Sequence, residues 1–161
     1  MDFIAIIQSK PVLIGLHLGF AIIGIDAFLW LFGKLRGHGD QSQRSLIVKA
    51  IVGVFSFAAS WIFGGYYYVI HYGTLVRPII KSGGVPWAHN IVMEVKEHIF
   101  LFIIPLAMTA LFITLLDSET MAKLKLRKLA GYLALTIALL GLLIGAMGFI
   151  VSMAARWGVF N

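Results

Sequence analysis

Four long stretches of this chain carry almost no charge, and this feature decides what the chain can fold into. Residues 11–33 contain one full charge, Asp26, and residues 50–76 contain none. Residues 99–116 and 129–155 are also uncharged. A run of about 20 apolar residues spans the hydrocarbon core of a bilayer, where backbone polar groups must be satisfied within a helix. The sequence therefore predicts four transmembrane helices.

Composition and loop length predict how these helices are arranged. The chain has 161 residues, of which 60% are hydrophobic and 12% are charged, and its mean hydropathy is +0.95, which is more apolar than a soluble domain of this length. Short connections predict a single all-α domain, residues 1–161, that forms an integral membrane four-helix up-down bundle. The expected spans are approximately 11–33, 50–72, 98–116 and 129–155. Residues 77–96 are expected to form a loop that leads into the third span, with a helix start at Pro86, where the missing N–H of proline costs nothing.

The distribution of basic residues predicts the orientation of the bundle. Eight of the 13 Lys and Arg residues lie in the connections after the first and third spans, and five lie on the opposite side. Because basic loops stay in the cytoplasm, both termini are expected on the outer, extracytoplasmic side, in a prokaryotic plasma membrane. The net charge of +6 is spread through these loops, which indicates contact with the lipid bilayer rather than nucleic acid. The absence of Cys excludes disulfides, thiolate metal sites and covalent c-type haem.

Four of the five histidines are predicted to gather on the outer side. His17 lies near the start of the first span, His71 at the end of the second and His98 at the start of the third, while His89 lies in the intervening loop. Because the spans alternate in direction, these positions share one side of the membrane, and only His38 falls on the other. Ionisable groups at a lipid boundary are costly, so the cluster is a candidate functional site.

Two acidic residues accompany the third-span histidine. Glu94 and His98 are four residues apart and therefore share a helix face, with Glu97 on the flank of that face. We expect Glu94 or Glu97 to accept protons, because a carboxylate at a lipid boundary is costly to keep charged.

The leading hypothesis is a b-type haem. Two imidazoles from different helices at similar depth could ligate the iron, and His17 with His98 is the preferred pair, with His71 as the substitute. Arg77 or Arg156 could contact the haem propionates. The expected function is electron transfer by a haem-b-binding membrane protein, linked to quinol or acting as a subunit of a larger respiratory complex.

Two other classes of function compete with this hypothesis. His17, His71, His98 and Glu94 form a mixed nitrogen and oxygen set suited to copper, iron or zinc, as in a metal-binding or metallocentre-assembly protein. The Glu-x-x-His spacing of di-iron bundles is not present. The last class is an accessory subunit without a cofactor, which packs against a larger membrane complex or forms a homo-oligomer.

Asp26 is the other costly group in the spans. It lies nine residues from His17, which on a straight helix is near 180° of rotation, so the two side chains should face different surroundings. Ser56, Thr109 and Thr136 are the polar neighbours expected at its depth. Three interpretations remain open: a hydrogen-bonded carboxyl that fixes helix packing, a proton relay, or a contact with another subunit.

Two glycine pairs follow the small-xxx-small spacing that lets membrane helices approach closely. They are Gly15 with Gly19 in the first span and Gly141 with Gly145 in the fourth. Their expected role is helix packing.

Overall fold

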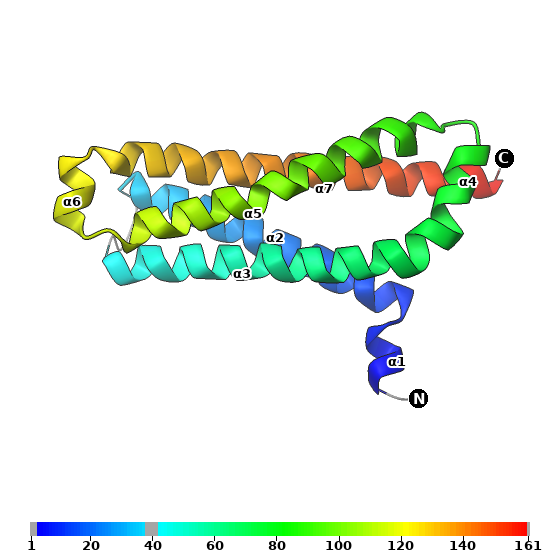
Figure 1. Cartoon of the computed structure of the whole chain (residues 1–161), viewed down its shortest axis with the longest axis horizontal. Coiled ribbons are helices and arrows are strands. Elements are labelled where there is room, and N and C mark those ends of the chain that lie inside the picture. Colours follow the sequence, from blue (N-terminus) through cyan, green and yellow to red (C-terminus); the bar gives the residue numbers. More distant parts are fainter. Residues whose placement is uncertain (1–2, 38–41, 161) are drawn as a thin grey trace.

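The computed structural model describes residues 3–37 and 42–160, and the elements in these ranges are all helices. In chain order they are α1 (Phe3–Ile7), α2 (Lys10–Leu35), α3 (Gln43–Tyr67), the π-helix η1 (Tyr68–Val76), α4 (Arg77–Ser82), the π-helix η2 (Ala88–Met93), α5 (Glu94–Leu115), α6 (Ser118–Lys123) and α7 (Leu126–Phe160). Four helical segments are long and apolar enough to cross a membrane: Lys10–Leu35, Gln43–Ser82, Ala88–Leu115 and Leu126–Val159. The predicted all-α up-down bundle of four long apolar helices is confirmed (Figure 1).

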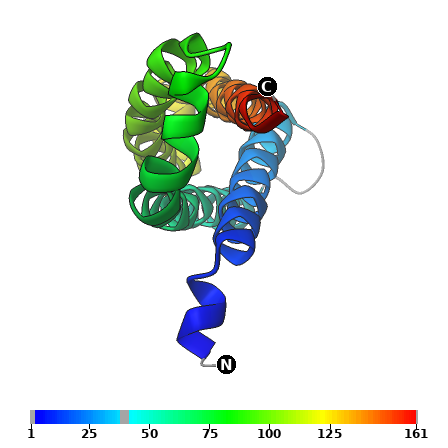
Figure 2. The same cartoon turned by 90° about the vertical axis from the view of Figure 1, so that its right-hand side faces the viewer.

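The four long helices alternate in direction around a ring. Helix α2 packs against α3 and α7, and α5 packs against the same two helices, so that α2 and α5 lie diagonally opposite (Figure 2). Both ends of the chain lie at one end of the bundle, which also holds α4 and is here called the terminal end (Figure 1). The opposite end, which holds α6, is called the hairpin end.

Phenylalanines that face glycines fix the register between α2 and α3. The Phe28 and Phe57 rings are stacked with centroids 5.8 Å apart. A Cβ on Gly53 would lie 2.5 Å from the Phe28 ring, and one on Gly24 would lie 3.0 Å from the Phe57 ring. Each ring therefore fills the space that a missing side chain leaves on the neighbouring helix, which holds the two helices at one relative height.

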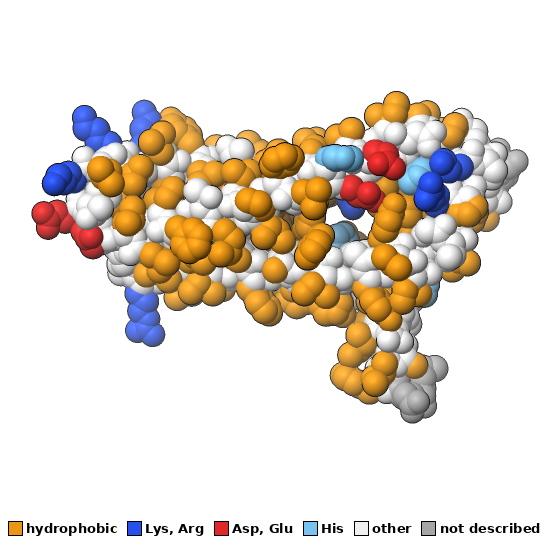
Figure 3. All heavy atoms as spheres, viewed as in Figure 1, with side chains coloured by type: hydrophobic (Ala, Val, Ile, Leu, Met, Phe, Trp, Pro, Cys, Tyr) orange, Lys and Arg blue, Asp and Glu red, His pale blue; other side chains and the backbone are white. Residues whose placement is uncertain are grey.

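Large apolar side chains cover the outside of the bundle. Phe55 is 65% exposed and Leu101 is 61% exposed, whereas Phe28 and Ile103 inside the bundle are fully buried. Apolar side chains lie along the visible face of the bundle, while Lys, Arg, Asp and Glu gather towards its two ends (Figure 3). This distribution is the one expected of a protein surrounded by lipid.

Side chains at the hairpin end satisfy the free backbone groups of the helix termini. Asp117 accepts a hydrogen bond from the Thr120 backbone N–H at 2.8 Å and so caps α6. This bond holds the pKa of the Asp117 carboxyl below its usual value. The Arg127 Nε donates to the Leu35 carbonyl at the end of α2 at 3.1 Å. Gln43 Nε2 donates to the Thr114 carbonyl at 2.9 Å.

Residues 77–96 are mostly helical, so the loop predicted for them is wrong, whereas the helix start predicted at Pro86 is confirmed. The second span does not end at residue 72 but continues through η1 and α4 to Ser82. The third span begins at Ala88 rather than at residue 98. Proline and charged residues suggested a loop, but Pro78 lies in the first turn of α4, directly after η1, and the helical segment continues past it. The helices thus extend beyond the apolar run itself.

The contact between Gly53 and Phe28 predicts a specific loss of stability. Gly53→Ala should lower the free energy of unfolding by about 1–3 kcal/mol, because the new methyl group overlaps the Phe28 ring. Gly65→Ala in the same helix is the matched control, since nothing lies within 4 Å of its added Cβ, and it should be neutral or slightly stabilising. Denaturant unfolding in detergent measures both, and equal effects would contradict the packing described.

Candidate functional site

Polar side chains from different spans meet inside the terminal half of the bundle. They are His17 on α2, Ser60 on α3, Tyr68 on η1, and Lys96 and Glu97 on α5, and we call this set the interior cluster. His17 lies seven residues after Lys10, about 10 Å along the helix at 1.5 Å per residue. The cluster therefore lies within the apolar part of the molecule.

The hydrogen bonds of His17 determine which ring nitrogen carries its proton. His17 Nδ1 lies 2.9 Å from the Ser60 carbonyl oxygen, which can only accept a hydrogen bond. The Ser60 hydroxyl, 3.0 Å from the same nitrogen, donates to the His17 carbonyl at 3.0 Å. In its neutral form the ring must therefore be protonated at Nδ1, and Nε2 keeps its lone pair. Bonding of this kind on one nitrogen is how proteins orient a histidine that binds iron or another metal with the other nitrogen.

Gly64 provides the space that the His17 ring occupies. A Cβ on Gly64 would lie only 2.5 Å from His17 Nδ1, so any larger residue would displace the imidazole. Ser60 and Gly64 are four residues apart on α3 and therefore face α2 together. One face of α3 thus both bonds the ring and leaves room for it.

Lys96 reaches from α5 into the bundle. Its Cε would lie 3.6 Å from a Cβ added to Gly148, which places the side chain against α7. Its charge also acts on His17 on the diagonally opposite helix, and on Glu97 next to it. A positive charge in this interior would stabilise negative charge on a bound group, because the dielectric constant is low.

Glu97 connects the cluster to the terminal end. Its side chain lies next to Tyr68, and its Oε1 is buried and has no hydrogen-bond partner among the described residues. The Tyr68 ring stacks on Tyr72 at 5.1 Å, and the Tyr72 hydroxyl lies 3.0 Å from His89 Nδ1. A series of titratable side chains thus runs from the middle of the terminal half to the buried His89.

His98 does not join His17 in the structure. The His98 side chain is exposed, and its Nδ1 lies 2.6 Å from the Glu94 carbonyl of its own helix. It lies two residues from Lys96, which is about 200° around the helix, so it points away from the interior when Lys96 points inward. The predicted pair of imidazoles on one pocket is therefore not formed.

The other predicted ligands are also dispersed. His71 Nε2 lies 3.1 Å from the Gln8 carbonyl, and Glu94, Arg77 and Arg156 have exposed side chains. Within residues 3–37 and 42–160, no three His, Asp or Glu side chains lie together so that they could hold a metal ion. The four-ligand set predicted from His17, His71, His98 and Glu94 is thus not assembled in the described part of the chain. His38 lies outside the described residues.

Asp26 lies on the outer surface of α2, not inside the bundle. Its side chain is exposed, whereas its expected neighbour Ser56 is buried in the core. Thr109 and Thr136 are themselves exposed, and the Thr109 hydroxyl donates to the Pro105 carbonyl of its own helix. The expectation that Asp26 meets these polar groups is not met. Asp26 does face away from the cluster, as its distance from His17 in the sequence predicts.

Lys96, Ser60 and Tyr68 are functional candidates that the sequence reasoning did not select. Lys96 precedes the expected apolar span, which begins at residue 98, and the sequence therefore does not predict that its side chain faces the interior. The predicted helix start at Pro86 agrees with the structure, since the Asn90 N–H donates to the Pro86 carbonyl at 3.0 Å. A helix that starts at this point already contains Lys96 two turns later.

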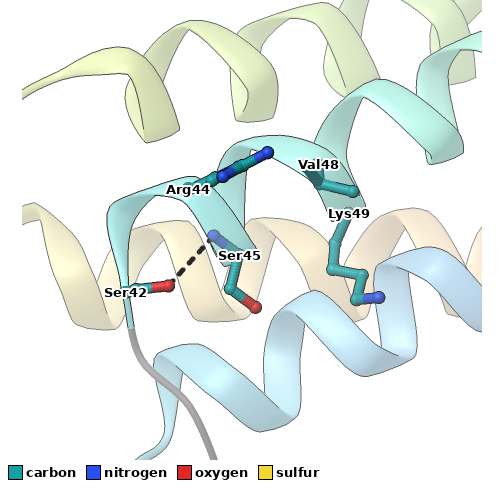
Figure 4. Close-up of a pocket in the computed structure, with 5 residues that line it drawn as sticks. All are labelled: Ser42, Arg44, Ser45, Val48 and Lys49. Atoms are coloured by element: carbon teal, nitrogen blue, oxygen red, sulfur yellow. Dashed lines mark hydrogen bonds between the residues drawn. The ribbon is translucent and has the colours of Figure 1, made fainter.

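The surface of the molecule is hollowed next to the cluster. Figure 3 shows acidic and histidine side chains gathered on the terminal half beside an opening between α3 and α5. A different depression lies at the start of α3 and is lined by Ser42, Arg44, Ser45, Val48 and Lys49 (Figure 4). It lies near the hairpin end, where Ser42 caps the helix by accepting a bond from the Ser45 N–H at 3.3 Å. The depression is therefore separate from the interior cluster.

The geometry fits a haem in one respect and not in another. His17 presents an oriented ring whose Nε2 is unprotonated, which suits one axial ligand, while Gly64 makes room for the ring on its Nδ1 side. His98 does not supply the second ligand in this arrangement.

The molecule belongs to the class of helical integral membrane proteins with a polar interior site. No protein family, no curated protein and no solved structure matches the chain in the comparisons made.

The bonding of His17 makes a spectroscopic prediction. In ¹⁵N-histidine NMR of the protein, neutral His17 should show a protonated Nδ1 and an unprotonated Nε2. The His17 signal is the one that disappears in the His17→Gln variant. Gly64→Ala should shift this signal, because its Cβ overlaps the ring, whereas Gly65→Ala should not. A proton on Nε2 in the unmodified protein would contradict the assigned tautomer.

Proposed function

We propose that this protein transfers electrons in a prokaryotic plasma membrane and binds one b-type haem in its terminal half, on the extracytoplasmic side. The single observation that supports the proposal most is the state of His17. Its Nδ1 is occupied by the Ser60 carbonyl, so its Nε2 lone pair is available to iron. A haem would supply reversible one-electron chemistry at this position.

Each residue near His17 has a defined role in the proposal. Ser60 holds the imidazole in one tautomer and orientation, and Gly64 leaves the space in which the ring sits. Lys96 places a positive charge close enough to act on His17, which favours acceptance of an electron or of an anionic substituent such as a propionate. This assigns to Lys96 the role that the sequence suggested for Arg77 or Arg156.

Glu97 and Tyr68 are the groups proposed to handle protons. A buried carboxylate oxygen that has no partner among the described residues can accept a proton when an electron arrives nearby. Tyr68 lies next to this carboxylate and stacks on Tyr72, whose hydroxyl lies 3.0 Å from His89 Nδ1. We propose that protons exchange with the terminal end along these side chains.

The proposed electron partner is a quinol or a larger membrane complex. The opening between α3 and α5 lies on a surface that faces the bilayer, so a lipid-soluble donor could approach the cluster from the side (Figure 3). His98 and Glu94 lie on the exposed face of α5 and would contact such a partner rather than the haem.

A reduced-minus-oxidised spectrum of the purified protein tests the haem proposal. Protein produced with a full haem supply should show Soret and α bands, and His17→Gln should lose them. His98→Gln is the matched control and should keep them, because His98 points away from the cluster. A spectrum without haem bands would end the proposal. Copper, zinc or iron without porphyrin in elemental analysis would instead support the metal-handling alternative.

The charge of Lys96 makes a second prediction about the bound group. Lys96→Met should lower the reduction potential by roughly 50–100 mV, which corresponds to about 1–2 kcal/mol for one charge at an effective dielectric constant near 20. Lys81→Met removes an exposed charge on α4 and should change the potential much less. Redox titration measures both, and equal shifts would contradict a special position for Lys96.

A further inference from the structure

Asp26 is an acidic side chain on the surface that the bilayer covers. It lies 16 residues after the start of α2 and nine before its end, and its side chain is exposed. Ile22 and Trp30, one turn away on either side, are 57% and 59% exposed. A carboxyl in this position is costly in lipid, which implies that something other than lipid covers this face.

A positive charge lies on the same side of the bundle. Lys49 extends from α3 towards α2 (Figure 4), and its Nζ lies 3.8 Å from the centroid of the Trp30 ring. Trp30 is one turn from Asp26 on the same face of α2. Asp26 and Lys49 are therefore two opposite charges on one lateral surface.

The contacts between α2 and α3 define the heights of these two charges. Gly24 faces Phe57, and Phe28 faces Gly53. Because α2 and α3 are antiparallel, a residue of α2 and a residue of α3 lie at the same height when their numbers add up to 81. The backbone of Lys49 is then level with residue 32, and its side chain reaches back to the level of Trp30. Its ammonium thus lies about one helical turn, 5.4 Å, from the height of Asp26.

We infer that this face binds a second copy of the chain, with Asp26 of each copy paired to Lys49 of the other. Copies inserted with the same topology are parallel, so a two-fold axis along the membrane normal brings together groups of similar height. Opposite charges at similar height on one surface are self-complementary in such a dimer. The pair forms twice and replaces the contact of Asp26 with lipid.

The rest of the face allows the two α2 helices to approach closely. Gly15 and Gly19 lie on the same stripe as Asp26, and a Cβ added to either would meet nothing within 4 Å. The sequence suggested that they pack against other helices of the bundle, but within the described chain they face open space. In the dimer they provide the close backbone contact typical of small residues between membrane helices.

Cysteine cross-linking in native membranes tests the dimer, because the chain has no Cys of its own. Gly19→Cys and Ile23→Cys on the Asp26 side of α2 should form disulfide-linked dimers under oxidation. Leu143→Cys is the control. Gly141 of α7 faces Ile25 of α2, so Leu143 lies at the same height as Ile23, and its side chain is exposed on α7. Equal cross-linking of the control, a monomer only, or linkage to a different protein would each overturn the inference.

Charge variants test the pairing itself. Asp26→Asn and Lys49→Met should each weaken dimerisation roughly tenfold, as measured by dilution in detergent or lipid, because each removes both symmetry-related pairs. The exchange Asp26→Lys with Lys49→Asp should restore it. Lys128→Met is the matched control, since Lys128 also lies over an aromatic ring, 5.8 Å from the Tyr132 centroid. If the dimer affinity of both single variants equals that of the unmodified protein, this pairing is excluded.

Discussion

Hydrocarbon offers no hydrogen bonds, and this constraint sorts the polar residues of the spans. His17 bonds Ser60 across two helices, the Tyr72 hydroxyl meets His89, and Thr109 bonds a carbonyl of its own helix. In each case a polar group is satisfied inside the protein. Asp26, the one acidic residue of α2, faces outward, and the same constraint then points to a protein contact rather than to lipid. The interior cluster and the proposed dimer surface are thus two consequences of one solvent property.

The packing of aromatic rings on glycines determines where the cluster can form. The Phe28 and Phe57 rings set the height of α2 against α3 in the middle of the bundle. The same register brings His17 beside Gly64 two to three turns further along, where the imidazole takes the place that a ring takes at Gly53. At this height a polar side chain thus occupies a position that is otherwise suited to phenylalanine.

The sequence predicted the spans well because charge-free runs report directly on burial in lipid. It predicted the helical extensions poorly, since the π-helices η1 and η2 carry the backbone through residues whose composition suggests a loop. The candidate site was predicted from the side of the membrane on which its residues lie, and this reasoning could not say which way each side chain points. His98 and Lys96 differ by about 200° on one helix, so a small uncertainty in where that helix begins exchanges the inward and the outward residue.

The geometry of α2 links the two proposals physically. His17 and Asp26 are half a rotation apart on one rigid helix, so a contact on the Asp26 face does not cover the interior cluster. The helix must keep its rotation about its own axis for His17 to reach the Ser60 carbonyl at 2.9 Å. Gly24 and Phe57 restrain that rotation from inside, and a partner bound to Asp26 would restrain it from outside. Dimerisation would therefore help to hold the imidazole in its oriented tautomer without taking part in the chemistry.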